Sequence, residues 1–214
     1  MRQVLRLSLL ALLSFGASAG VISEFVGGTL AYLNVYHFGQ MVTTPAGGPW
    51  DDITFCFSEA LAVGTYGCTE GLVDDPGTLY LLSQPYSGLP SDLGSAPGLI
   101  ATSIGTSQCG SSPIPGLQTW CAWIFDSSVV LLPNMTYYFY EDGVWEGQTD
   151  GMSGDPIGPF PGYMTEGYPN LNTPFQEIYS TDYHLTGDPV PEPSPLTLVA
   201  LGLLPLLITR RGAS

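Results

Sequence analysis

Most of this chain consists of short runs in which apolar and polar residues alternate, separated by turns rich in Gly and Pro. In DITFCFS, Ile53, Phe55 and Phe57 alternate with Thr, Cys and Ser, which is the period of a strand with one buried face. Turns such as AGGPW and DDPG separate these runs, and no body segment has a helical period. We expect strands over residues 52–58, 78–83, 98–104, 120–125, 127–132, 136–141 and 175–181.

These elements predict an all-β fold, an antiparallel β-sandwich or jelly roll, flanked by an N-terminal signal helix and a C-terminal hydrophobic helix. The body, residues 20–188, has about 170 residues, which is enough for one domain with its own core. Residues 141–172 are dense in Gly and Pro and poor in apolar pairs, so we expect a long surface excursion there.

The body carries only acidic charge. All 19 Asp and Glu lie between Glu24 and Glu192, and the chain has no Lys. The basic residues are Arg2, Arg6, Arg210 and Arg211. Binding to phosphate backbones and to anionic lipid headgroups depends on Lys and Arg. The composition therefore argues against nucleic acid as a partner.

The first 19 residues have the order of a secretory signal peptide. MRQVLR is a basic region, LSLLALLSF is an apolar run too short to span a bilayer, and Ala17 and Ala19 are the small residues that signal peptidase requires. We expect residues 1–19 to be removed and the mature chain to begin at Gly20.

The segment 189–214 is apolar in its middle part, with VPEPS before it and two arginines after it. The 15 residues from 195 to 209 would cover about 22 Å as a helix, against a hydrocarbon core of about 30 Å. Such a short segment spans the bilayer only if Arg210 and Arg211 extend toward the cytoplasmic headgroups. The prolines before it hold the chain extended, the form that a protease active site accepts.

VPEPS, an apolar stretch and a terminal Arg pair together resemble the PEP-CTERM sorting signal, over residues 189–214. By position, the resemblance implies that Pro191, Glu192 and Pro193 are the recognition tripeptide. It implies that residues 196–208 are the membrane segment and that Arg210 and Arg211 are the stop-transfer cluster. It also implies a Gram-negative host and recognition by an exosortase, a multi-pass membrane enzyme with a cysteine nucleophile. The tail of an inner-membrane-anchored precursor is then removed, and the body reaches the cell surface or the exopolysaccharide matrix. An ordinary single-span tail anchor is the alternative.

The body itself resembles the β-sandwich modules called choice-of-anchor domains, which bacteria attach to interchangeable C-terminal anchors. The phrases that carry this resemblance are GTLYLLSQPYSGLP, SVVLLPNMTYYFYEDGVW and DYHLTGDPVPEPS. The resemblance is diffuse, covers residues 28–188 and includes no catalytic signature. It supports the fold more than any activity.

Four cysteines in an exported chain predict two disulfides. We favour Cys56 with Cys68 and Cys109 with Cys121, because the members of each pair are twelve residues apart and flank a turn, GTYG or SSPIPG. Each bond would then clamp a local hairpin. Zinc is the rival interpretation, but no Cys-x-x-Cys occurs and both histidines are distant from the cysteines in sequence.

The sequence gives catalysis weak support. Ser-His-Asp chemistry needs a base, and only His37 and His184 are available, both in strand-like surroundings that favour packed or surface histidines. Glycosidase chemistry uses two carboxylates, and Glu141, Asp142 and Glu146 lie close together, although a solvated hairpin tip has the same composition.

Acids beside aromatic residues also suit sugar binding, in which a ring stacks on an aromatic side chain. The candidate glycan contacts are Trp50, Trp145, Glu141 and Asp142. We expect no cofactor, with calcium as the one candidate at Asp150 and Asp155 or at Asp74 and Asp75, where the ligand spacing is not that of an EF-hand.

We therefore expect a non-enzymatic, exported protein that acts at the cell surface or in the extracellular matrix and is linked to exopolysaccharide or biofilm. A carbohydrate-binding module of the matrix and a secreted glycan hydrolase are the alternatives. The inner membrane is expected to be a transient partner, through the C-terminal segment.

The charge pattern makes a direct prediction about the exported product. Every Arg lies in a segment that we expect to be removed, so the mature body should contain no trypsin site. Trypsin should leave it whole, and intact mass spectrometry should find a chain that begins at Gly20. Secreted material that still contains Arg2 or Arg210 would contradict processing at the corresponding end.

Overall fold

The structure of the chain is a computed structural model, which describes residues 20–25, 30–33, 37–57, 71–72, 77–111, 118–143, 151–155, 160–165, 173–178, 180–181 and 183–191. Of residues 30–33, 71–72, 108–111, 118–121 and 151–155 it describes the backbone alone. The expected signal peptide, Glu192, Pro193 and the segment 196–214 lie outside the described residues.

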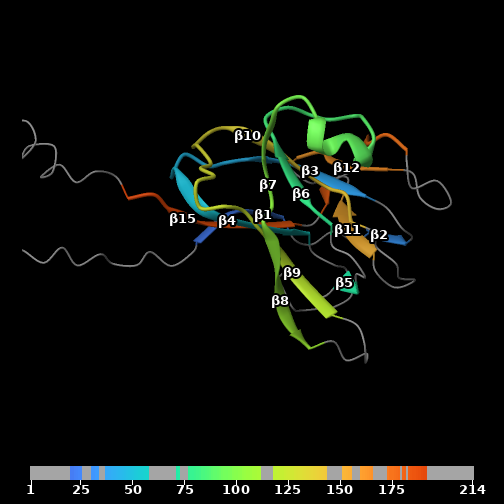
Figure 1. Cartoon of the computed structure of the whole chain (residues 1–214), viewed down its shortest axis with the longest axis horizontal. Helices are drawn as coiled ribbons and strands as arrows, with labels where there is room; N and C mark the ends of the chain where they lie inside the picture. Colours follow the sequence, from blue (N-terminus) through green and yellow to red (C-terminus); the bar gives the residue numbers. More distant parts are fainter. Residues whose placement is uncertain are drawn as a thin grey trace, which may run out of the picture.

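The described chain is mostly β-strand, arranged in antiparallel sheets, so the all-β class is confirmed (Figure 1). The first sheet has the order β1 (Gly20–Phe25), β15 (Tyr183–Pro189), β4 (Trp50–Phe57), β9 (Gln118–Ile124) and β5 (Gly71–Leu72), with β8 (Gly105–Ser111) also paired to β9. The second has the order β13 (Gln176–Ile178), β12 (Gly162–Met164), β3 (Phe38–Thr43), β10 (Thr136–Glu141), β6 (Leu79–Leu82) and β7 (Leu99–Thr102).

Two smaller elements complete the described fold. A short sheet has the order β14 (Ser180–Thr181), β11 (Gly151–Asp155) and β2 (Leu30–Leu33). The 3-10 helix η1 (Pro90–Ser95) begins with a proline, which fits the first turn of a helix because it needs no donor there. In the ranges that the structure describes, no helix is long and apolar enough to cross a membrane.

Five of the expected strand runs correspond to β4, β6, β7, β9 and β10, and the run at 175–181 is divided between β13 and β14. The expected strand at 127–132 is wrong, because only Leu131 forms an isolated bridge, to Trp50. The chain turns here instead: Asp126 Oδ1 accepts the backbone N–H of Ser128, and the Val129 N–H donates to the Asp126 carbonyl. A local Asx turn thus prevails over β propensity.

The expected surface excursion over residues 141–172 is also corrected. Glu141 ends β10 and has no exposed area, and residues 162–164 form β12, which pairs with β3. Tyr163 is 7% exposed and its ring lies 5.2 Å from the ring of Tyr140. Met164 of the same strand packs against the main core, so this short strand joins the sheet without an alternating pattern in its sequence.

The main core lies where side chains of the two large sheets meet. Phe55 of β4 stacks on Phe139 of β10, with ring centroids 4.4 Å apart and planes 11° apart. On the same side of β4, Tyr183 of β15 stacks on Phe55 at 5.9 Å. The two sheets therefore face each other, and the apolar residues of both bury against this aromatic centre.

A second cluster covers the opposite face of the second sheet, beneath η1. It contains Leu93, Tyr140, Tyr163 and Phe175, all buried. Gly39 of β3 is required here, because a Cβ at this position would lie 2.4 Å from the Tyr140 ring. The sheet is thus buried on both faces along this part.

The two ends of the described chain meet in the first sheet. Gly20 is the Cα partner of Gly187, and β15 is paired on its other side with β4, as far as Pro189 opposite Trp50. One residue further on, the Val190 N–H donates to the Pro49 carbonyl at 2.8 Å. The sheet therefore holds the chain up to the residue before Pro191.

We predict that Phe55→Ala destabilises the body by about 3–5 kcal/mol, since it removes the ring at the centre of the core. Ile104→Ala is the matched control, because Ile104 is 67% exposed and its truncation should change stability by less than about 0.5 kcal/mol. Urea unfolding followed by aromatic fluorescence measures both. Equal midpoints for the two variants would contradict this account of the core.

Candidate functional site

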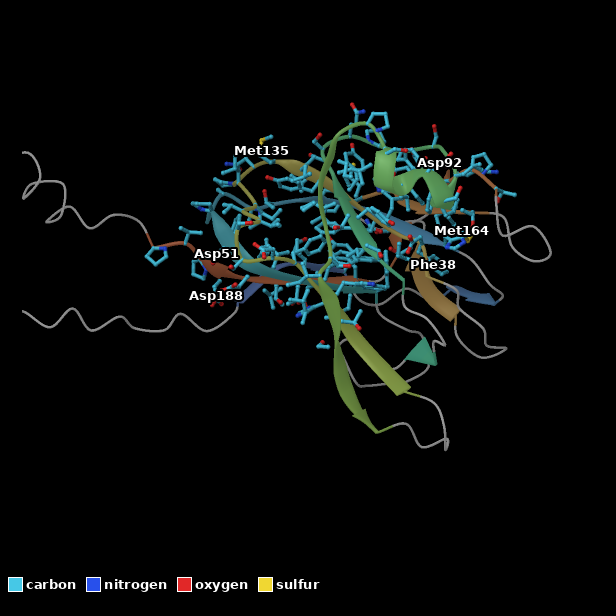
Figure 2. All side chains as sticks on the ribbon, viewed as in Figure 1. Phe38, Asp51, Asp92, Met135, Met164 and Asp188 are labelled. Atoms are coloured by element: carbon cyan, nitrogen blue, oxygen red, sulfur yellow. The ribbon has the colours of Figure 1, made fainter. Side chains whose placement is uncertain are left out.

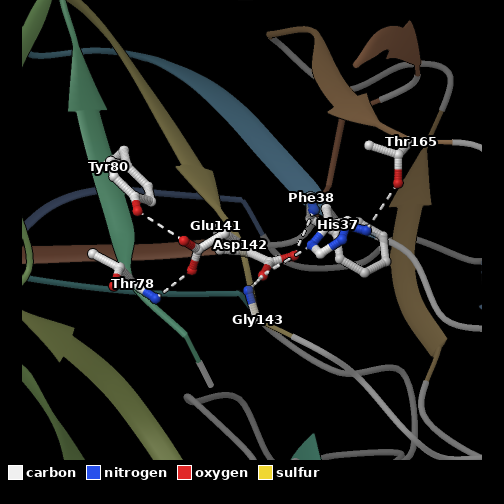
Figure 3. A network of polar contacts seen from close by, with 8 residues as sticks. All are labelled: His37, Phe38, Thr78, Tyr80, Glu141, Asp142, Gly143 and Thr165. Atoms are coloured by element: carbon white, nitrogen blue, oxygen red, sulfur yellow. Dashed lines mark hydrogen bonds and ion pairs between the residues drawn. The ribbon is translucent and has the colours of Figure 1, made fainter. Parts of the chain in front are cut away.

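The candidate site is a cluster of polar side chains at one end of the second sheet, where β10 ends and β3 begins (Figure 3). Its centre is Glu141, whose side chain has no exposed area. Glu141 Oε1 accepts the backbone N–H of Phe38 and Oε2 accepts that of Gly143, both at 2.6 Å. A buried carboxylate needs such donors, because its water has been removed.

His37 supplies the basic group of the cluster. Its Nδ1 lies 3.9 Å from Glu141 Oε2, an ion-pair distance that is too long for a hydrogen bond, and this nitrogen is buried without a hydrogen-bond partner. The backbone of His37 is fixed by Thr165: its N–H donates to Thr165 Oγ1 at 3.2 Å, and its carbonyl accepts the Thr165 N–H at 3.1 Å. The cluster thus connects β10 and β3 with the chain after β12.

Asp142 extends the cluster to β6. Its Oδ1 accepts the Thr78 N–H at 2.6 Å, and its Oδ2 accepts the Tyr80 hydroxyl at 2.7 Å. Burial, and then the Asp142 carboxylate, raise the pKa of Tyr80 to about 12, so this hydroxyl stays protonated and donates at neutral pH. Figure 3 shows Glu141 and Asp142 directed to opposite sides of the same strand end.

The protonation of His37 and Glu141 is linked. Burial raises the pKa of Glu141 above its ordinary value of 4.5, although His37 and the two N–H donors oppose this. Burial lowers the pKa of His37, but the Glu141 and Asp142 carboxylates outweigh burial, so the net effect raises the pKa above 6.5. The pair therefore holds its protons more tightly in the folded chain than in the unfolded chain.

This arrangement is suited to holding strands together rather than to catalysis. A histidine beside a carboxylate is one half of a catalytic triad, but a nucleophile must contact the imidazole. Within the described ranges, no serine hydroxyl is hydrogen-bonded to His37 or His184. The expectation that His37 is a packed residue fits its 6% exposure.

His184 belongs to a different pair. It lies on β15 opposite Glu24 of β1, and its Nδ1 is 3.1 Å from Glu24 Oε2. The side chains are 26% and 50% exposed, so water screens the pair and it adds little to stability. This pair lies in the first sheet, whereas His37 leads into a strand of the second.

Two of the four candidate glycan contacts are buried. Trp50 is 8% exposed within the core and Glu141 is fully buried, so neither presents a surface to a sugar. The solvated-tip interpretation of Glu141 is wrong for the same reason. Asp142 is half-buried and already hydrogen-bonded to Thr78 and Tyr80. Trp145 and Glu146 lie outside the described residues.

The described part of the chain contains no group of three His, Cys, Asp or Glu residues that could hold a metal ion. Of the calcium candidates, Asp155 ends β11 opposite Ser180, with its backbone alone described. Asp74, Asp75 and Asp150 lie outside the described residues, so calcium stays a hypothesis.

Cys56 is disulfide-bonded and is the only cysteine whose side chain the structure describes, so the pairing stays a prediction. β4 and β5 pair along the same edge of β9, at Trp123 and Trp120, so these two strands lie close together on this edge. A Cys56–Cys68 bond is compatible with this arrangement. A Cys56–Cys121 bond would join neighbouring strands of one sheet.

The other predicted pair, Cys109 and Cys121, lies on β8 and β9, which form a hairpin. Gln108 of β8 is the Cα partner of Trp120 of β9. Cys109 and Cys121 are the next residues along their strands. Figure 1 shows these two strands of the first sheet extending away from its other long strands as a ribbon. The hairpin expected between these cysteines is present, and the bond itself stays a prediction.

Sequence reasoning missed Thr165, Tyr80 and Thr78 as members of the polar cluster. Thr165 and Thr78 each share two hydrogen bonds with the cluster and Tyr80 donates one, but the partners are more than sixty positions apart, so no spacing in the sequence relates them to Glu141 or Asp142. Their strands become neighbours only through sheet order. The buried pair left one weak signal, since His37 is one of only two histidines in a chain without Lys.

Comparisons with protein-family models, with curated proteins and with solved structures found no match to this chain.

We predict that the folded body becomes less stable as the pH rises from about 5 to 8. Both folded pKa values lie above the unfolded ones, so this stabilisation is fully present below 4.5 and is lost as the pH rises through the folded pKa values of Glu141 and His37. Other carboxylates are normally ionised across this range. Thermal unfolding at each pH measures the slope.

Glu141→Gln should flatten this slope, whereas Glu24→Gln, which alters the exposed histidine pair, should keep it. His37→Gln should cost about 3–5 kcal/mol at neutral pH, because it leaves a buried carboxylate without its basic partner. An unchanged slope in Glu141→Gln would show that the buried pair does not set the pH dependence.

Proposed function

We propose that this chain is an exported, non-enzymatic protein whose body is an antiparallel β-sandwich and whose C-terminal segment is a sorting signal of the PEP-CTERM type. An exosortase-type membrane enzyme would recognise Pro191, Glu192 and Pro193, remove the tail and release the body to the cell surface or the extracellular matrix. The signal helix and the hydrophobic tail helix belong to this proposal.

The observation that carries the proposal is the position of the sheet ends. The domain expected from the sequence runs from 20 to 188, between a signal peptide and a sorting signal. β1 begins at Gly20, β15 ends at Pro189, and Gly20 and Gly187 are Cα partners. Cleavage before Gly20 and beyond Val190 would therefore remove no residue that takes part in the described pairing.

The face-to-face contact of the two large sheets supports the sandwich. Phe55 and Phe139 stack at 4.4 Å across the interface, and Leu79, Leu131 and Leu185 are fully buried around them. The burial of the His37–Glu141 pair supports a structural role for these two residues. No described observation favours glycan binding or hydrolysis over this proposal.

We predict that Glu192→Ala leaves export intact but causes the full-length chain to accumulate in the inner membrane, because only the recognition carboxylate is lost. Glu177→Ala is the matched control, since Glu177 is an exposed carboxylate within the body on β13. Fractionation of an exosortase-positive host, with immunoblotting by an antiserum raised against the body, compares the two variants with the wild type.

The wild type and Glu177→Ala should yield a shortened, released form. If the wild type keeps its full-length mass in the membrane, or if deletion of the exosortase changes nothing, the segment is a simple tail anchor. Replacement of Arg210 and Arg211 by Ser should separately let the tail slip outward, because the positive-inside bias is lost.

A further inference from the structure

Three apolar side chains are exposed together on the segment between Phe125 and β10. Val130, Leu132 and Met135 are 41%, 50% and 47% exposed, whereas Leu131 between them is fully buried. Scattered apolar residues are common on protein surfaces, but three on one short segment form a patch that calls for an explanation.

The backbone that presents this patch is held firmly. Leu131 and Trp50 exchange two backbone hydrogen bonds, at 2.8 and 3.0 Å. Thr44 Oγ1 donates to the Leu132 carbonyl at 2.6 Å, and the Thr44 N–H donates to the Met135 carbonyl at 2.9 Å. The exposure of the three side chains is therefore fixed by the fold.

The patch lies at the end of the body where the chain leaves the sheet. Trp50, which is bridged to Leu131, is also the Cα partner of Pro189, and Val190 donates to Pro49. Figure 2 shows Met135 at the same end as Asp51 and Asp188, with Phe38, Asp92 and Met164 at the other. Val21, 56% exposed on β1 opposite Thr186, lies near this exit as well.

The chain beyond the exit is short. From Pro191 to Leu196, where the proposed membrane segment begins, there are five residues, which reach at most about 17 Å when fully extended. The headgroup region on each side of a bilayer is about 6 Å thick. Insertion of 196–208 would thus bring the exit end of the body to the membrane surface.

We propose that this end of the body docks on the bilayer, with Val130, Leu132 and Met135 entering the headgroup region beside the C-terminal segment. The inference rests on the proposed function, because it takes 196–208 to be the membrane segment. Asp51, Asp126 and Asp188 lie close to the patch and the body has no Lys or Arg, so the fitting surface is neutral lipid. Docking would hold the recognition tripeptide at the depth of a membrane-embedded enzyme.

Brominated lipid can test this contact, because bromine quenches an indole that enters the acyl-chain boundary. Leu132→Trp places an indole in the patch, and Ile100→Trp is the matched control on β7, where Ile100 is 47% exposed. The full chain, purified after export, is reconstituted into phosphatidylcholine vesicles with and without brominated acyl chains. We expect the emission added by Leu132→Trp to be lost in brominated vesicles and that of Ile100→Trp to persist.

The outcomes separate the two proposals. If the chain fails to float with the vesicles, the membrane segment and this inference both fail. If it floats and both added indoles respond alike, docking is wrong while the membrane segment stands. An indole at 132 that is shielded from acrylamide but not quenched by bromine would assign the patch to a second copy of the chain and would overturn membrane docking.

Discussion

Pairing of β15 on both sides determines how the rest of this fold is arranged. Its partners are β1 at the start of the described chain and β4, so the first sheet depends on contacts between residues more than a hundred positions apart. Tyr183 and Leu185 of β15 also fill the core around Phe55. Such non-local topologies fold slowly, because the chain loses the entropy of closing long loops before the non-local contacts can stabilise it. The first sheet cannot be completed until residue 189 is available, so under the proposed export nearly the whole body would cross the membrane before this sheet forms.

The opposite end of the body buries a carboxylate, although the body contains no Lys or Arg. A chain whose body has no Lys or Arg has few ways to bury a carboxylate, yet Glu141 ends a central strand with its side chain directed inward. Two backbone N–H groups and His37 stabilise it. The same contacts fix the start of β3 and the chain after β10, so charge compensation and strand alignment depend on the same atoms. Asp142, one residue further, binds β6 in the same manner.

The sequence predicted the fold class and most central strands, because residues such as Phe55, Leu81 and Phe139 alternate with residues on the opposite face of the sheet. It did not predict β12, where Tyr163 is buried and Met164 packs against the core, or the turn at Asp126, where two hydrogen bonds prevail over a run of Val and Leu. For the site, the sequence identified Glu141, Asp142 and His37 as residues of interest but not their contact. That contact depends on β3 lying beside β10, and strand order leaves no mark in local periodicity.

The position of Val190 links the fold to the sorting proposal. Its N–H forms the last described hydrogen bond of the body, to Pro49, and the three prolines that follow at alternate positions have no N–H to extend the sheet. Cutting the chain at or beyond the tripeptide would therefore remove no residue that takes part in the described pairing. The described sheet thus uses β15 to its last residue, Pro189, and ends just before the proline-rich stretch. Under the proposed function, removal of the tail would therefore leave every described backbone pair of the body in place, as a sorting signal attached to an independent domain requires.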